Sequence, residues 1–193
     1  MTYANAAVAD PESDAAHALA RGDRGRALDV LMPAYGKMIY GYCRRILEDA
    51  DLADDVLQTT FLQAFEAFDR FDGRSSLRTW LFGIAHHRCL DAMKSRRRRQ
   101  HRLDSLDVVA QVADPSIGIE DSAAADQRRA ALQDCLEQLE AHVRQTVLLR
   151  FDLGFSYPEI AAICNEKPPA LQARVARALP VLRRCLETKG VGQ

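Results

Sequence analysis

Apolar residues recur at steps of three and four along most of the chain, the spacing that places side chains on one face of an α-helix. The pattern is strongest between Asp51 and Arg99, where it predicts two consecutive helices. The first carries the apolar face Val56, Leu57, Phe61, Leu62, Phe65 and Phe68, and the second carries Leu77, Trp80, Leu81, Ile84, Ala85 and Leu90. Because no segment alternates between apolar and polar residues as a strand does, the sequence predicts an all-α protein.

The N-terminal part is less regular. Residues 1–14 are rich in alanine and weakly patterned, which predicts a mobile tail. Residues 15–31 favour helix, although Gly22 and Gly25 interrupt the pattern. Pro33 suits the first turn of a further helix, because that position needs no backbone N–H.

Polar signals mark where helices end and begin. Gly73 breaks the first helix of the central pair, and Ser75 or Ser76 can cap the second by accepting a hydrogen bond from a free amide. In the C-terminal part, Ser156 and Glu159 have the spacing of a capping box. A short apolar helix is therefore expected to begin directly after Ser156.

The C-terminal part has the pattern of a helix-turn-helix unit. Helical periodicity returns after Asp126, and the short apolar helix ends at a three-residue turn, residues 165–167. Pro168 allows a second helix to start, and Pro180 is expected to bend it or to end its regular part. Such a unit can place its second helix in the major groove of DNA.

Between the two helical parts lies a stretch without helical pattern. Residues 103–126 hold six acids and no base, and they include Asp114-Pro115 and Gly118. The predicted organisation is a tail at 1–14, a domain at 15–98, a linker at 99–125 and a second domain at 126–189. The fold class is all-α, with two small helical domains joined by a flexible acidic linker.

Charge is unevenly distributed, although the formal net charge is only −1. Residues 48–72 hold eight acids and one base, whereas residues 88–102 hold seven bases and one acid. An acidic helix beside an aromatic helix with a basic end suggests one surface for a protein and one for nucleic acid. The run Arg96–Arg99 could hold phosphates, or it could be a solvated helix end.

The sequence has neither the pattern of a membrane helix nor that of a secretory signal. No apolar run approaches the eighteen or so residues of a membrane helix, and residues 1–13 lack a basic start and an apolar core. The five cysteines are widely spaced without a CxxC pair, and most lie on apolar helical faces. We therefore expect reduced cysteines, no membrane insertion and a cytoplasmic setting.

Candidate catalytic and metal-binding groups do not form a site. Asp54 and Asp55 are adjacent on a helix and point about 100° apart, so they do not converge. His86 and Cys89 would supply only two of the four ligands that zinc prefers. The sequence contains no glycine-rich phosphate loop, GxSxG or HExxH motif. We expect neither enzymatic activity nor a cofactor.

DNA binding by the second domain is plausible on pattern alone, and an ordinary helical pair with solvated arginines is the alternative. Residues 170–189 hold five bases and one acid, which favours the DNA interpretation. In the first domain, lone aromatic residues such as Trp80, Phe82 and Phe71 are more often core than base-stacking groups.

Several motifs in this order resemble the extracytoplasmic-function (ECF) sigma factors of bacterial RNA polymerase. The resemblance rests on Ala53–Phe61, Phe71–Leu81, Arg88–Asp91, Leu149-Arg150 and Ser156–Ala161. It implies a sigma2 domain, a flexible linker and a sigma4 domain, with core RNA polymerase and promoter DNA as partners. An anti-sigma factor is a further partner that the resemblance implies.

The resemblance also implies roles for individual residues. The surface that docks on core polymerase would include Asp54, Asp55, Gln58 and Phe61. The group that reads the −10 element would include Phe71, Arg74, Ser75, Arg78, Trp80 and His87. The helix that reads the −35 element would present Gln172, Ala173, Arg174 and Arg177.

Two segments depart from the family pattern: the turn at residues 165–169 has a different sequence, and residues 170–173 lack the usual hydroxyls and cation. Weak or altered −35 binding is therefore expected. The predicted function is promoter-specific transcription initiation as an alternative sigma factor. One alternative is a stand-alone helix-turn-helix regulator that binds duplex DNA without polymerase. Another is an interaction protein that no longer reads DNA.

Overall fold

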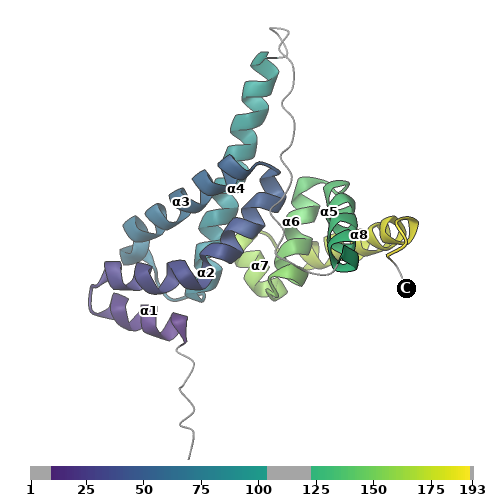
Figure 1. Ribbon diagram of the computed structural model, residues 1–193. Helices are drawn as coiled ribbons and strands as arrows, with labels where there is room; N and C mark the ends of the chain where they lie inside the picture. The colour runs from purple at the N-terminus through teal and green to yellow at the C-terminus, as the bar shows by residue number, and fades with distance from the viewer. Residues whose placement is uncertain (1–9, 104–122, 192–193) are drawn as a thin grey trace, which may run out of the picture.

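The computed structural model describes residues 10–103 and 123–191, and the elements within these ranges are helical (Figure 1). The first unit comprises α1 (Pro11–Ala20), α2 (Arg24–Leu47), α3 (Ala50–Ala67), the short η1 (Phe68–Arg70) and α4 (Leu77–Leu103). The second unit comprises α5 (Ala123–Glu137), α6 (Ala141–Val147), η3 (Leu148–Asp152), α7 (Tyr157–Cys164) and α8 (Pro168–Thr188). The prediction of an all-α fold is confirmed.

Helix α1 begins inside the predicted tail. Asp10 caps it by accepting a hydrogen bond from the Glu12 N–H at 3.2 Å, and Ala15 and Ala18 are buried against the first unit. The tail prediction at 1–14 was therefore wrong for residues 11–14, because Asp10 caps a helix that begins at Pro11 and continues into the part predicted to be helical.

Pro33 lies inside α2 and does not begin a helix. It is exposed, whereas Leu31 and Tyr35 on either side are buried. A proline in a helix interior removes one backbone hydrogen bond at a cost of about 3 kcal/mol. Burial of the apolar face of α2 offsets that cost and keeps the helix continuous.

Helix α4 is longer than the sequence indicated. Ser76 caps its start by accepting a hydrogen bond from the Thr79 N–H at 3.0 Å, as one of the two expected serines. Its helical hydrogen bonding continues through the basic run to Leu103. Residues 99–103 and 123–125, which the sequence assigned to the linker, are thus helical, and residues 104–122 lie outside the described residues.

The helix-turn-helix prediction is borne out in the second unit. Ser156 and Glu159 form the expected capping box at the start of α7. Asn165 ends α7 with φ +54°, a left-handed conformation that asparagine tolerates better than most residues. Pro180 does not end α8, which continues to Thr188.

The two units pack against each other, which the sequence did not indicate. Helix α7 lies along α4, and the ring of Phe82 on α4 meets the ring of Phe155 edge-on at 5.1 Å between centroids (Figure 1). Both rings are fully buried. The apolar cores of the two units are therefore continuous within the described residues.

The expectation of reduced cysteines was wrong for one pair. Cys135 on α5 and Cys185 on α8 form a disulfide, although fifty residues separate them in sequence. Spacing alone could not show this pairing, because it arises from the packing of α5 on α8. Cys43, Cys89 and Cys164 are free. None of the helices in the described ranges is long and apolar enough to span a bilayer.

His86 makes the stability of the first unit depend on pH. It is 4% exposed, and its Nδ1 lies 3.0 Å from the Tyr42 hydroxyl. Burial, with a smaller contribution from His87, lowers the pKa of His86 from 6.5 to about 4. Between these two pH values only the unfolded state takes up the proton, so the free energy of unfolding falls as the pH is lowered.

We expect His86→Gln to remove this dependence, because glutamine can hydrogen-bond Tyr42 but does not titrate. On lowering the pH from 7 to 5, the wild type should lose about 2 kcal/mol more of its unfolding free energy than the variant. Denaturant titrations at both pH values measure the difference. Equal losses in the two proteins would contradict the assignment.

Candidate nucleic-acid and protein interfaces

The outer face of α3 combines acidic and apolar side chains. Asp54, Asp55 and Gln58 are exposed, as the core-docking prediction requires. Leu62 is 61% exposed and Phe65 is 38% exposed. From Asp55 to Phe65 these positions follow steps of three and four, so they form one stripe along the helix.

Phe61 does not belong to this stripe. It is 3% exposed, and its ring lies against Gly36 of α2, 3.8 Å from where a Cβ of residue 36 would lie. The prediction that Phe61 is a surface contact was wrong in its placement. Leu62 and Phe65 were not predicted as surface residues, because the sequence analysis assigned every apolar residue of this helix to the core. In the structure only part of that apolar face is buried.

The loop between η1 and α4 presents Arg74 to solvent. Gly73 adopts φ +73°, and Asp72 accepts a hydrogen bond from the Arg74 N–H at 3.1 Å. That backbone hydrogen bond is the main reason why the pKa of Asp72 lies below its ordinary value. The Arg74 side chain also pairs with Asp72 at 2.5 Å and remains 88% exposed.

Trp80 is packed by aromatic rings on one side. The centroid of Phe71 lies 5.4 Å from that of Trp80, and the centroid of Phe68 lies 5.7 Å away. Trp80 is only half-buried, so part of its surface remains available. Phe71 is therefore a packing partner of Trp80.

A cleft of about 420 Å³ opens between α3 and α4. Three of the six predicted −10 residues line it, Ser75, Trp80 and His87. Gln63 and Arg88 line it as well. In the described part of the chain, Gln63 Oε1 and Arg88 Nε are buried without hydrogen-bond partners, although the Arg88 Nη2 pairs with Asp91 at 3.3 Å. Two residues that line the cleft therefore each carry one unsatisfied polar atom.

The sequence analysis missed Gln63 and Arg88 as cleft residues. Gln63 follows Thr60, which is fully buried, by three positions on α3, so it is a polar residue near the core-facing side of that helix. Arg88 follows Ile84 by four positions on α4. A polar or charged residue beside an apolar helical face was the available signal.

Arg78 does not reach this cleft. Its guanidinium lies over the ring of Phe155 at 4.0 Å from the centroid, and its Nη2 donates a hydrogen bond to the Leu153 carbonyl. Both partners belong to the second unit. In this arrangement a predicted DNA-contacting cation is therefore bound within the chain.

Ion pairs flank this contact between the units. Arg45 on α2 donates to both carboxylate oxygens of Asp152, at 2.9 and 2.5 Å. Arg144 on α6 is 6% exposed and pairs with Glu48, the left-handed residue that ends α2. A buried arginine that lost this partner would be strongly destabilising, so the pair favours the packed arrangement once it has formed.

The exposed face of α8 holds three of the four residues predicted to read the −35 element, Gln172, Ala173 and Arg177. Arg174 is different. Its side chain is 15% exposed and pairs with Glu166 at 2.9 Å, and it also donates to Thr146 at 3.0 Å. Its hydrogen bonds hold the pKa of Glu166 below its ordinary value.

Arg174 therefore joins the turn to α6 and α8. Its predicted role as a DNA contact is not supported by its position.

Comparisons with known proteins agree with this architecture. The family described as Sigma-70 region 2 matches residues 31–99, and Sigma-70 region 4 matches residues 129–179. The ECF RNA polymerase sigma factor SigC of Mycobacterium tuberculosis (strain CDC 1551 / Oshkosh) is 34% identical over 185 residues, which cover 92% of this chain and 93% of that protein.

Two solved structures share the fold. CnrH in complex with the cytosolic domain of CnrY aligns with a TM-score of 0.68 and 25% identity, over 93% of this chain and 99% of CnrH. RpoE in complex with the anti-sigma factor NepR from Bartonella quintana aligns with a TM-score of 0.66 and 24% identity, over 81% of this chain and 94% of RpoE.

The chain thus belongs to the sigma-70 family, with region 2 in the first unit and region 4 in the second. Within that family it is an ECF sigma factor. It binds core RNA polymerase and directs promoter-specific transcription initiation, which decides against the stand-alone regulator that the sequence left open. The members of this family are transcription regulators.

The contact between the units can be tested by charge reversal. Arg45→Asp or Asp152→Arg alone places like charges together and should weaken the contact by roughly 1 kcal/mol. Small-angle X-ray scattering should then show a larger radius of gyration for each single variant. The double variant, Arg45→Asp with Asp152→Arg, restores the pair and should return to the wild-type radius.

Arg24 and Asp69 supply the matched control, because they form an exposed ion pair within the first unit. Reversing either of these charges should leave the radius unchanged. If Arg45 and Asp152 behave in the same way as this pair, the packing of the two units does not depend on their attraction.

Proposed function

We propose that α3 docks this sigma factor on core polymerase through Asp55, Gln58, Leu62 and Phe65. Two large apolar side chains that lie exposed beside each other are typical of a protein interface. The acidic residues would orient the encounter with a basic partner surface, and the apolar residues would contribute the area buried on docking. Asp54 lies at the edge of this stripe.

We further propose that the cleft between α3 and α4 receives a base of the −10 element after the strands separate. The unsatisfied Gln63 Oε1 and Arg88 Nε carry this proposal, because buried polar atoms without partners suit the edge of a bound base. Trp80 offers a partly exposed ring at the cleft for stacking. Ser75 and His87 line its rim, and Arg74 is placed to meet the DNA backbone.

For the −35 element, the proposed reading surface is Gln172, Ala173 and Arg177 on α8. Arg177 is the exposed arginine of the predicted pair, so it would contact a guanine edge or a phosphate. Arg174 would instead hold the turn in position through Glu166. The absence of hydroxyl side chains at residues 170–173 leaves fewer phosphate contacts than the family pattern provides.

The packed arrangement of the two units is proposed to be the inactive form. Ala162 of α7 lines the same cleft as Trp80 and His87, and Arg78 is bound by the second unit. Reading of the −10 element would therefore require α7 to separate from α4. The proposal adds no enzymatic activity and no cofactor, and the protein would act beside core polymerase in the cytoplasm.

An anti-sigma factor is the proposed partner that stabilises this inactive form. The solved structures of CnrH and RpoE are both complexes, with the cytosolic domain of CnrY and with the anti-sigma factor NepR. Both align over most of the described chain, including both units.

Core docking can be tested at the α3 stripe. We expect Asp55→Lys and Leu62→Ala each to weaken the affinity for core polymerase by about tenfold or more, since each removes a central contact. Fluorescence anisotropy with purified core polymerase measures the affinity. Asp14→Lys, the same charge reversal at an exposed site on α1, should leave it unchanged, and an equal loss there would indicate a nonspecific charge effect.

The proposed base-binding cleft can be tested at Gln63, the residue that follows Leu62 on α3. Gln63→Met keeps the size of the side chain and removes the amide, so discrimination at one −10 position should fall about tenfold or more. Transcription assays with core polymerase and promoters that carry each base at that position measure this preference. Leu62→Ala should lower the total transcript but retain the preference, and a Gln63→Met variant with wild-type discrimination would exclude the cleft.

A further inference from the structure

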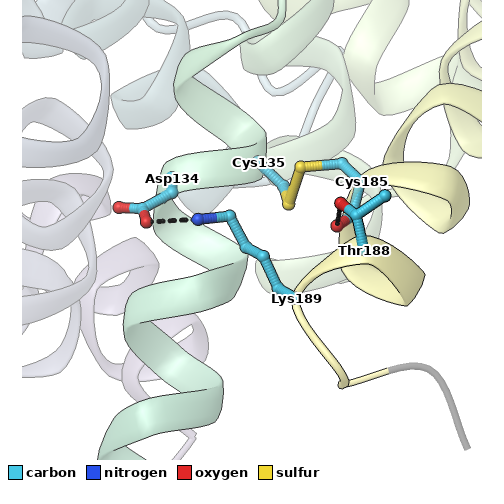
Figure 2. The surroundings of a disulfide bond; sticks show 5 residues. All are labelled: Asp134, Cys135, Cys185, Thr188 and Lys189. Atoms are coloured by element: carbon cyan, nitrogen blue, oxygen red, sulfur yellow. Dashed lines mark hydrogen bonds and ion pairs between the residues drawn. A yellow bond between two sulfur atoms is a disulfide. The ribbon is translucent and has the colours of Figure 1, made fainter.

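The disulfide between Cys135 and Cys185 joins α5 covalently to the C-terminal half of α8. Figure 2 shows α5 and the C-terminal half of α8 linked by this bond, with Lys189 reaching Asp134 beside it. The Cα atoms of the two cysteines are 5.8 Å apart, and the Lys189 Nζ lies 2.7 Å from an oxygen of Asp134. The closed loop encloses the whole helix-turn-helix.

The two sulfur atoms differ in access. Cys135 is 1% exposed, whereas Cys185 is partly exposed and lines a cleft of about 400 Å³ on the surface. Arg184 and Lys189 also line this cleft, together with uncharged residues. In the reduced protein Cys185 is therefore the cysteine of the pair that a dissolved oxidant can reach.

The bond lies beyond a weak point of α8. Pro180 interrupts the hydrogen bonding of the helix between the exposed face with Arg177 and the C-terminal half with Cys185. In that half, Leu182 is buried and Leu186 packs on the core. The disulfide therefore holds the part of α8 that follows Pro180 on α5.

We propose that Cys185 and Cys135 form a reversible redox pair, with a low-molecular-weight disulfide as the oxidant. The Cys185 thiolate attacks that disulfide, forms a mixed disulfide and releases one small thiolate. The Cys135 thiolate then attacks Cys185 Sγ, forms the internal bond and releases the second small thiolate. The two cysteine protons end on the two released thiols, so two electrons pass from the protein to the oxidant.

A reducing cytoplasm, the setting expected for this protein, favours a reversible disulfide over a permanent structural one. Disulfides in cytoplasmic proteins of mesophiles are usually transient, catalytic or redox-sensing, because thiol reductants keep cysteines reduced there. Oxidation would stabilise the second unit by closing a long loop, which should raise its unfolding midpoint by roughly 10 °C. Reduction would let the C-terminal half of α8 separate from α5.

The test uses the full chain, first reduced with dithiothreitol and then incubated with oxidised glutathione. Alkylation of the remaining thiols followed by peptide mass mapping identifies each state. We expect the wild type to form the Cys135–Cys185 bond and to regain the higher midpoint. Cys135→Ser should accumulate glutathione on Cys185, because no second thiol releases it, whereas Cys185→Ser should leave Cys135 unmodified.

Cys164→Ser is the matched control, since Cys164 is a free cysteine of the second unit. It should form the bond and show the same difference in midpoint as the wild type. A wild type whose midpoint is the same with and without dithiothreitol would overturn the proposal. So would equal glutathione incorporation in Cys135→Ser and Cys185→Ser. These readouts require neither polymerase nor DNA, so they stand apart from the proposed interfaces.

Discussion

The contact between α4 and α7 is the interaction on which the described arrangement depends. Phe82 and Phe155 bury their rings against each other, and Arg78 lies over Phe155 while it donates to a carbonyl of the second unit. An arginine over an aromatic face is more strongly held when water is excluded, and Phe155 is fully buried. This contact brings together two regions that the chain itself connects only through residues 104–122.

The same contact explains why one surface of the first unit is exposed and another is covered. The stripe on α3 remains exposed with the second unit packed, so it is accessible in this form. The start of α4, in contrast, meets α7, and Thr79 lies 3.4 Å from Glu159 across the contact. The proposed polymerase-docking surface and the proposed promoter-reading surface therefore differ in accessibility in this arrangement.

Much of the fold could be predicted from local signals. The apolar spacing gave the helices, and the cap residues Ser76 and Ser156 gave two of their starting points, because capping depends on residues only three apart. Pro33 misled the prediction, since the burial that keeps α2 continuous comes from other helices. The end of α4 was placed too early, because a run of arginines is compatible both with helix and with a solvated loop.

The candidate surfaces were predicted less completely, for a related reason. The sequence showed that Phe61, Leu62 and Phe65 share an apolar arc, but only the packing of α2 against α3 decides which of them is buried. Arg174 and Arg177 likewise looked equivalent until the structure paired one of them with Glu166. The disulfide was beyond local inference, because it joins helices fifty residues apart.

The endpoints of α4 and α5 set a limit on how far the two regions can separate. From Leu103 to Ala123 the backbone makes twenty steps, which in full extension span at most about 70 Å. That length is about two turns of duplex DNA, at roughly 34 Å for each turn. The proposed DNA-reading residues lie at the start of α4 and on α8, away from these endpoints, so the helices themselves add to the distance that the chain can bridge along a duplex.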